Sequence, residues 1–142
     1  GKANVINEGS DLTIIGFSMS VHRILSSFPE IQKLGLNPDI IDLRSIKPLD
    51  EELIEKYAKN CKHLISIEEN VVSGGAGSAV NEFLSTIGFS EKLKIFGIPD
   101  KFPIVGSQSD QREAAGLTRE EIIRKLSLEL NLEELNKKIS TQ

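Results

Sequence analysis

Short runs of consecutive apolar residues recur along the chain and alternate with longer segments of helical periodicity. The clearest runs occupy residues 12–16, 39–43, 63–67 and 93–96, and residues 3–7 form a weaker one that suits an edge strand. Continuous rather than alternating apolarity is typical of strands that are covered on both faces, as in a parallel sheet. The pattern therefore predicts five short strands.

Helical segments are predicted between and after these strands. Val21, Ile24 and Leu25 give residues 18–27 one apolar face, and Pro29 is expected to kink or end that helix because its ring replaces the backbone N–H.

Polar residues and glycines mark the ends of the predicted helices. Ser18, Asp50 and Thr118 each precede an apolar periodic segment and are predicted N-caps, and Thr118 also opens a capping box. A helix over residues 78–87 is predicted to begin at its serine and to stop at Gly88.

The alternation of strands and helices predicts an α/β fold, a three-layer α/β/α sandwich with right-handed crossovers. We expect one domain over residues 1–130, followed by a short amphipathic or frayed tail over residues 131–142.

Composition narrows the class of protein. The chain has 142 residues and a net charge of −4, with acidic and basic residues interleaved, which argues against nucleic acid or an anionic membrane as a partner. No apolar run approaches the ~20 residues that a membrane span needs. Cys61 has no second cysteine to pair with, which favours a reducing compartment. We expect a cytoplasmic protein, or a plastid one if the source is eukaryotic.

The segment over residues 67–84 concentrates the candidate chemistry. Two carboxylates and an amide follow the apolar strand, and a glycine-rich turn leads into the next helix. In parallel α/β sheets, ligands usually bind at the carboxyl ends of the strands. The candidate residues for an anion-binding or interface turn are Glu69, Asn70, Gly74, Gly75, Gly77 and Ser78.

Three interpretations of this turn stay open: a tight structural turn, an anion site on the amides of the helix start, or a contact between subunits. It is not a Walker loop, because the Lys-Ser/Thr ending is absent. It fits half of the dinucleotide fingerprint, since Gly75 and Gly77 are present but Val80 replaces the third small residue. Asp100 lies at the distance of a ribose-binding acid, but in a predicted loop.

The other candidate residues give weaker indications of a catalytic or metal-binding site. Glu68 and Glu69 are neighbours in an extended segment, so their side chains should point to opposite sides and only one can enter a given site. Cys61 and His63 lack the third ligand that zinc requires, and His22 is distant in sequence. We expect a partly buried, unreactive thiol and no metal site.

Several motifs in this order resemble one enzyme family. They are GKANVINEGSDLTIIGF at the start, IIDLRSIKPLDEELI over residues 40–54, IEENVVSGGAGSAVNEFL over residues 67–84, and GIPDKFPIVGSQ followed by GLTREEI. On these motifs the chain resembles the C-terminal domain of transketolase-like thiamine-diphosphate enzymes, and among them the 1-deoxy-D-xylulose-5-phosphate synthases. The resemblance spans residues 1 to about 126.

The resemblance implies a five-stranded mixed sheet whose single antiparallel strand maps onto residues 3–7. It implies a homodimeric transferase of isoprenoid precursor and thiamine biosynthesis. That enzyme condenses pyruvate with glyceraldehyde 3-phosphate and releases carbon dioxide. Thiamine diphosphate and Mg²⁺ would be held by preceding domains, because the Gly-Asp-Gly cofactor motif is absent here. No catalytic, cofactor-binding or metal-binding residue is therefore carried over, and this fragment alone is expected to be inactive.

Two departures from the family pattern are visible. Phe17-Ser18-Met19 replaces a small Gly-Thr or Gly-Ser pair, and Pro29 is unusual in the first helix. Alternatives at this stage are a regulatory anion- or nucleotide-binding module, or the equivalent domain of a transketolase or of a 2-oxo acid dehydrogenase β subunit.

Overall fold

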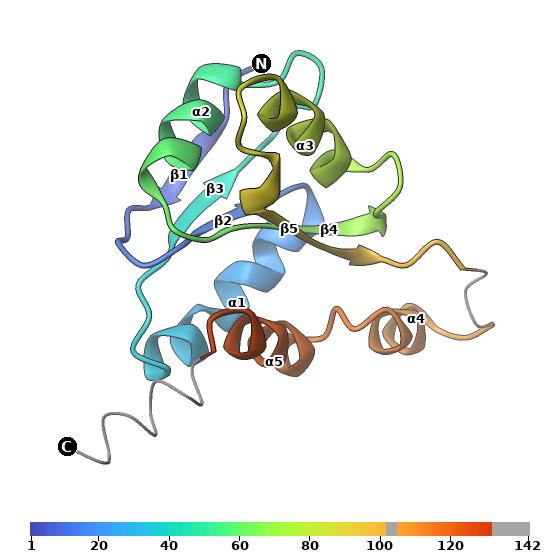
Figure 1. Ribbon diagram of the computed structural model, residues 1–142. Helices are drawn as coiled ribbons and strands as arrows, with labels where there is room; N and C mark the ends of the chain where they lie inside the picture. The colour runs from blue at the N-terminus through green and yellow to red at the C-terminus, as the bar shows by residue number, and fades with distance from the viewer. Residues whose placement is uncertain (102–104, 132–142) are drawn as a thin grey trace.

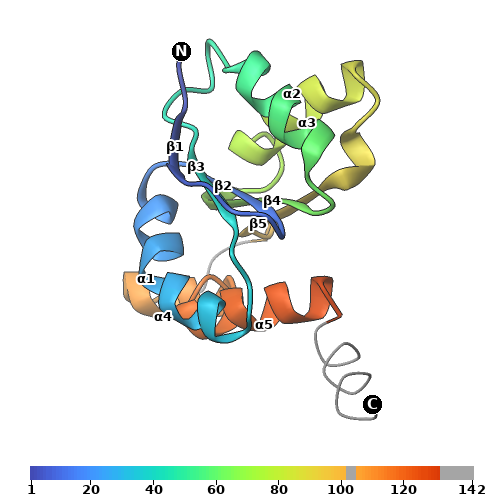
Figure 2. The same cartoon turned by 90° about the vertical axis from the view of Figure 1, so that its left-hand side faces the viewer.

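The computed structural model describes residues 1–101 and 105–131, and they form a five-stranded mixed sheet between two layers of helices (Figures 1 and 2). Along the chain the elements are β1 (Asn4–Asn7), β2 (Thr13–Gly16), α1 (Met19–Lys33), β3 (Asp39–Asp42), α2 (Glu51–Asn60), β4 (Leu64–Val71), α3 (Ala76–Thr86), the 3₁₀ turn η1 (Ser90–Lys92), β5 (Leu93–Ile98), α4 (Gln108–Ala114) and α5 (Arg119–Glu129).

The strand order is β1-β3-β2-β4-β5. β1 pairs with β3 in antiparallel orientation, and the remaining neighbours are parallel. The predicted three-layer fold and the antiparallel edge strand are therefore confirmed. The helices after β2 and β4 lead to opposite edges of the sheet, so the boundary between these two strands is a topological switch point.

Neighbouring residues of the central strands enter different cores. Ile15, Ile41 and Leu64 pack with α2 and α3, whereas Ile14 and Ile40 pack with α1 and α5 on the other face. Both faces of the central strands are thus covered, one by each helical layer, which explains why their apolar runs are continuous.

Helix α1 passes through Pro29 and continues to Lys33, so the predicted stop at this proline is wrong, while the predicted kink stays a prediction. Proline removes one backbone hydrogen bond, but Ile24 and Ile31 lie two turns apart on one face and are both fully buried beneath the sheet. Packing of that face holds the helix across the missing bond.

Other predicted boundaries shift by a few residues. β4 extends to Val71 and therefore contains the two glutamates that were expected to follow it, and α3 begins at Ala76 rather than Ser78. Helix α4 was not predicted at all, since its short polar segment carries no apolar period. The expected tail after residue 131 lies outside the described residues, and no helix among those described is long and apolar enough to cross a membrane.

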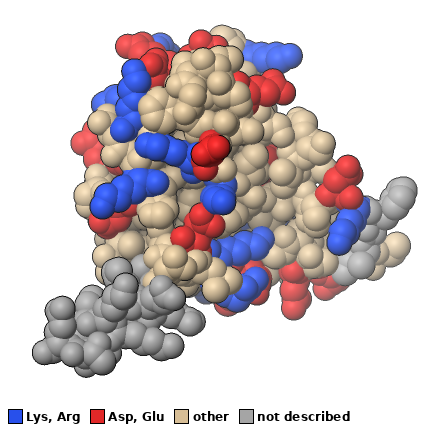
Figure 3. All heavy atoms as spheres, viewed as in Figure 1, with Lys and Arg blue, Asp and Glu red and all other residues tan. Residues whose placement is uncertain are grey.

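Two of the predicted N-caps are confirmed. Asp50 accepts a hydrogen bond from the N–H of Leu53 at 3.4 Å, and Thr118 accepts one from the N–H of Glu121 at 3.3 Å. On the face shown in Figure 3, basic and acidic side chains are interspersed, as the interleaved charges of the sequence suggested.

Candidate functional site

The carboxyl end of β4 presents its two glutamates to opposite faces of the sheet. Glu68 points toward α3, where its carboxylate meets the first amides of that helix. Glu69 points to the other face, where it meets Arg23 of α1 and Arg112 of α4. The alternation predicted from the sequence is confirmed, so the two carboxylates belong to separate environments.

Glu68 is 1% exposed and acts as an anion bound at the start of α3. Its Oε2 accepts a hydrogen bond from the N–H of Ala76 at 2.6 Å, and its Oε1 accepts one from the N–H of Gly77 at 3.1 Å. Amides at a helix start attract negative charge through the helix dipole. The chain therefore supplies the anion that such a turn could otherwise take from solution.

Burial raises the pKa of Glu68 above its ordinary value, while the hydrogen bonds from Gly77 and Ala76 act in the opposite direction. The carboxyl group is therefore held by the helix start at the cost of losing its water shell.

The glycines of the turn make room for this carboxylate. A Cβ at Gly75 would lie 2.3 Å from Oε2 of Glu68, and a Cβ at Gly77 would lie 2.6 Å from the hydroxyl oxygen of Ser66 and 2.7 Å from Cγ2 of Ile95. Only glycine allows the helix start to approach the strand this closely. The Ser66 hydroxyl is buried there without a hydrogen-bond partner.

The remaining candidate residues shape the turn itself. The Ser78 hydroxyl accepts a hydrogen bond from the N–H of Gly74 at 3.2 Å and donates one to the carbonyl of Val72. Gly74 has a φ of 77°, and Asn70 is exposed at the end of β4. These contacts give the turn a structural explanation, while its binding of an external anion or of a subunit stays a prediction.

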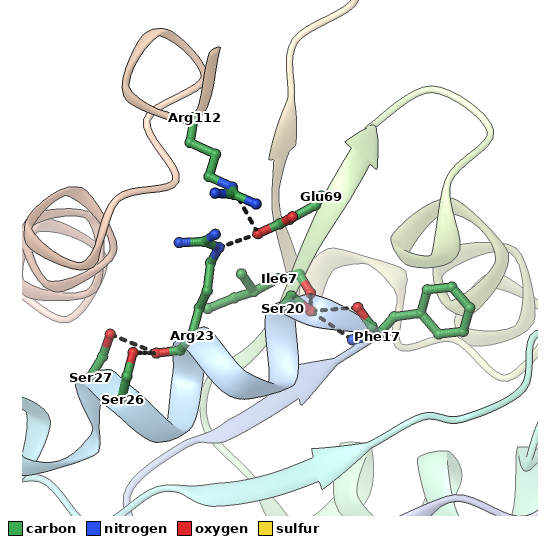
Figure 4. Close-up of polar contacts among 8 residues, drawn as sticks. All are labelled: Phe17, Ser20, Arg23, Ser26, Ser27, Ile67, Glu69 and Arg112. Carbon is green, nitrogen blue, oxygen red and sulfur yellow. Dashed lines mark hydrogen bonds and ion pairs between the residues drawn. The ribbon is translucent and has the colours of Figure 1, made fainter. Parts of the chain in front are cut away.

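Glu69 is the centre of an ion cluster that sequence reasoning missed. Its Oε1 forms ion pairs with Nε of Arg23 and, at 3.5 Å, with Nε of Arg112 (Figure 4). Arg23 was assigned to a helix without a role, and Arg112 lies on the helix that was not predicted. The pairing of Arg23 with Glu69 could have been predicted once the strand order was known. A basic residue in the helix after β2 should lie near the carboxyl end of β4, because β4 is the next strand in the sheet.

The turn between β2 and α1 has an unusual backbone. Ser18 has φ 57° and ψ −130° and occupies the predicted N-cap position of α1, but its side chain accepts no hydrogen bond from the helix amides. Ser20, in the first turn of α1, fixes this turn instead: its hydroxyl accepts a hydrogen bond from the N–H of Phe17 at 2.8 Å and contacts the carbonyl of Ile67. The strained position is the one at which the family pattern favours a small residue.

The other candidate groups are scattered. Cys61 is half-buried, and burial raises the pKa of its thiol, which disfavours the reactive thiolate. Asp100 is exposed in the loop after β5. Among residues 1–101 and 105–131, no group of three or more histidine, cysteine or acidic side chains could hold a metal ion.

The arrangement is therefore rich in ion pairs and helix contacts rather than in reactive groups. The hydroxyls of Ser20 and Ser78, for example, are hydrogen-bonded to the backbone carbonyls of Ile67 and Val72.

Comparison with protein families supplies the deciding observation, because the model of the transketolase C-terminal domain matches residues 1–122. The chain belongs to the transketolase C-terminal domain family. Two of its most similar curated relatives are 1-deoxy-D-xylulose-5-phosphate synthases. The one from Carboxydothermus hydrogenoformans is 38% identical over 88% of this chain. The one from Shouchella clausii is 41% identical over 86%.

This transketolase C-terminal domain spans 20% and 19% of the length of those two relatives. Among solved structures it is similar to a split-gene transketolase, described as an inactive β4 tetramer, with a TM-score of 0.79 and 28% identity. That match covers 92% of this chain and 43% of the other. The predicted family is thus confirmed by both sequence and fold.

Proposed function

We propose that this domain is the C-terminal, architectural domain of a 1-deoxy-D-xylulose-5-phosphate synthase. The observation that carries the proposal is the similarity to synthases of that name at 38% and 41% identity over most of the chain. The complete enzyme would condense pyruvate with glyceraldehyde 3-phosphate, release carbon dioxide and serve isoprenoid precursor and thiamine biosynthesis. In that enzyme the domain would pack against the catalytic domains and support a homodimer.

Thiamine diphosphate and Mg²⁺ would be bound by those other domains, because the residues described here do not fit them. A diphosphate needs free amides or cationic groups at a helix start, and the Ala76 and Gly77 amides of α3 are occupied by Glu68. Mg²⁺ prefers clustered oxygen ligands, and the described residues contain no acidic cluster of that kind. The domain alone would therefore have no catalytic activity.

Calorimetric titration with thiamine diphosphate and Mg²⁺ tests the absence of a cofactor site. We expect no saturable heat from the purified domain. Saturable binding in the micromolar range would overturn the architectural assignment.

A chimera tests the architectural role directly. The catalytic domains of the Carboxydothermus synthase, truncated before their own C-terminal domain, would be compared with the same domains fused to this chain. We expect the fusion to recover dimerisation and formation of 1-deoxy-D-xylulose 5-phosphate, both lost by the truncated protein. A soluble fusion that remains inactive and monomeric would contradict the proposal.

The equivalent domain of a transketolase is the second candidate, since the fold matches the split-gene transketolase with a TM-score of 0.79. A parallel fusion to transketolase catalytic domains separates the two. Recovery of ketol transfer without recovery of the synthase reaction would favour this second function.

A further inference from the structure

The first residues of the chain lie at the carboxyl edge of the parallel strands. β1 runs antiparallel to β3, so its first residue, Asn4, pairs with Asp42, the last residue of β3. Figures 1 and 2 show the N-terminus beside the connection from β3 to α2. A polypeptide joined to residue 1 would therefore reach the domain at this edge, because consecutive Cα atoms are only about 3.8 Å apart.

Asp50 holds this entry point in a fixed position. Its carboxylate, in a residue that is 5% exposed, accepts a hydrogen bond from the N–H of Ala3 at 2.9 Å and forms an ion pair with Lys2 at 3.4 Å. Gly1 lies against Pro48, since a Cβ at Gly1 would be 2.5 Å from Cγ of that proline. The loop before α2 thus sets the path along which the chain reaches β1.

A groove of about 490 Å³ begins at the same proline, between the loop before α2 and helix α3. The apolar residues that line this Pro48 groove are Ile46, Pro48 and Leu49 of the loop and Ala79 and Phe83 of the helix. Pro48 is exposed, and the side chains of Ile46 and Phe83 are only partly buried against the core. Concave apolar surfaces of this kind accept the side chains that anchor a protein–protein interface.

Three charged side chains also line the Pro48 groove, those of Lys47, Glu51 and Glu82. Among residues 1–101 and 105–131 none of these three forms an ion pair, so all of them are available to groups of a partner. One positive and two negative charges give them a net charge of −1. They therefore favour a partner that presents a basic group beside its apolar side chain.

We propose that the Pro48 groove receives the catalytic domain that precedes this chain in the complete enzyme. The inference rests on the proposed function, under which the catalytic domains join this chain at residue 1 and make up most of a protein of which it spans about one fifth. A domain attached there meets the groove first, because Gly1 already contacts the proline that lines it. An apolar side chain of the preceding domain fills the space between Pro48 and Phe83, and a basic group pairs with the acidic side chains.

Hydrogen exchange tests the proposal on the fusion described above, in which the catalytic domains of the Carboxydothermus synthase precede this chain. We expect the amides of residues 44–49 to exchange at least about tenfold more slowly in the fusion than in the chain alone, because docking covers this loop. Residues 8–11, at the opposite edge of the sheet, should exchange at the same rate in both proteins. Slowing at residues 44–49 that grows with the concentration of the chain alone would show that a second copy occupies the groove, and would overturn the proposal.

The same fusion separates this inference from the proposed function. Recovery of dimerisation and synthase activity without slower exchange at residues 44–49 would overturn the docking surface alone. Slower exchange in a fusion that stays inactive and monomeric would support the docking surface and count against the synthase assignment. An inactive, monomeric fusion with unchanged exchange would contradict both.

Substitutions on α3 assign the docking to the groove. Ala79→Arg places a long cationic side chain inside it. This variant of the fusion should restore fast exchange at residues 44–49 and lower synthase activity about tenfold, as expected when an interface anchor is displaced. Ser85→Arg is the matched control, because it adds the same side chain to the same helix at an exposed position that does not line the groove. It should change neither quantity.

Thr86→Arg covers the case in which Ala79→Arg disturbs folding. Thr86 lines the groove but is exposed, so this variant should keep the wild-type unfolding midpoint and still lower synthase activity about threefold. If Thr86→Arg and Ser85→Arg both match the wild-type fusion in exchange and activity, the groove is not the docking surface.

Discussion

Glu68 and Glu69 are neighbours in the sequence but differ in how they are neutralised. Glu68 is 1% exposed and bound by two backbone amides of one helix, whereas Glu69 is partly exposed and paired with side chains from two helices. Backbone donors are fixed by the helix itself, while guanidinium groups can exchange partners. The Glu68 side of this edge is therefore fixed by backbone hydrogen bonds, whereas the Glu69 side depends on ion pairs between side chains.

Removal of each carboxylate should show the largest contrast. Glu68→Ala leaves two buried amides without acceptors and should lower the free energy of unfolding by about 2–4 kcal/mol. Glu69→Ala removes a partly exposed ion cluster and should cost only about 0.5–1 kcal/mol. Urea denaturation of the two variants measures both values, and equal losses would contradict the distinction between the two sides.

A side chain added at the start of α3 should have the next largest effect on the free energy of unfolding. Gly77→Ala forces a Cβ to within 2.6 Å of the Ser66 hydroxyl oxygen and should cost about 1–3 kcal/mol through overpacking. Gly74→Ala is a suitable control, because nothing lies within 4 Å of its Cβ and only the positive φ opposes it, at about 1 kcal/mol. If the two substitutions cost the same in thermal unfolding, close packing is not what the turn requires.

Ser18→Gly should stabilise the domain. Its backbone, at φ 57° and ψ −130°, is one that glycine adopts freely, and relief of this strain should add about 1 kcal/mol to the free energy of unfolding. Ser26→Gly provides a control with the opposite sign, because glycine inside an exposed stretch of α1 should remove about 0.5–1 kcal/mol. A loss of stability in Ser18→Gly would show that the serine side chain contributes more than its strain costs.

The dependence of the free energy of unfolding on pH should show the smallest effect, and it tests the Glu68 carboxyl group specifically. Burial raises the pKa of Glu68 above 4.5, so the folded protein keeps this proton at pH values where the unfolded chain has released it. The stability of the wild type relative to Glu68→Gln should therefore fall as the pH rises from about 4.5 through the folded-state pKa, and then level off.

Urea unfolding of both proteins across this range measures the difference. A difference that grows with pH would mean that the hydrogen bonds from Gly77 and Ala76 outweigh burial.

The fold could be predicted from the sequence because the central strands carry apolar residues on both faces and the long helices have apolar stripes. The prediction failed at Pro29, where buried Ile24 and Ile31 hold the helix across a missing hydrogen bond. It also missed α4, whose seven residues are held by a capping box at Ser107 rather than by an apolar face. Tertiary packing thus explains why α1 continues through Pro29, and local capping explains why α4 forms. The periodicity of apolar residues predicts neither.

The sequence predicted where the candidate residues lie in the fold, but it did not predict their hydrogen-bond and ion-pair partners. Alternation along β4 correctly separated the two glutamates. No sequence rule shows, however, that Glu68 folds back onto the amides of the helix that follows it, or that Arg23 and Arg112 converge on Glu69 from helices far apart in the chain. Such contacts depend on the distance between elements, which only the folded structure fixes.

The carboxylate at the start of α3 is covalently part of the chain, so no change in the supply of dissolved phosphates or organic acids can leave that position vacant. A turn stabilised by a bound anion from solution would lose that stabilisation whenever the concentration of the anion fell. Here the junction between strand and helix should keep its shape whatever anions the surrounding solution contains.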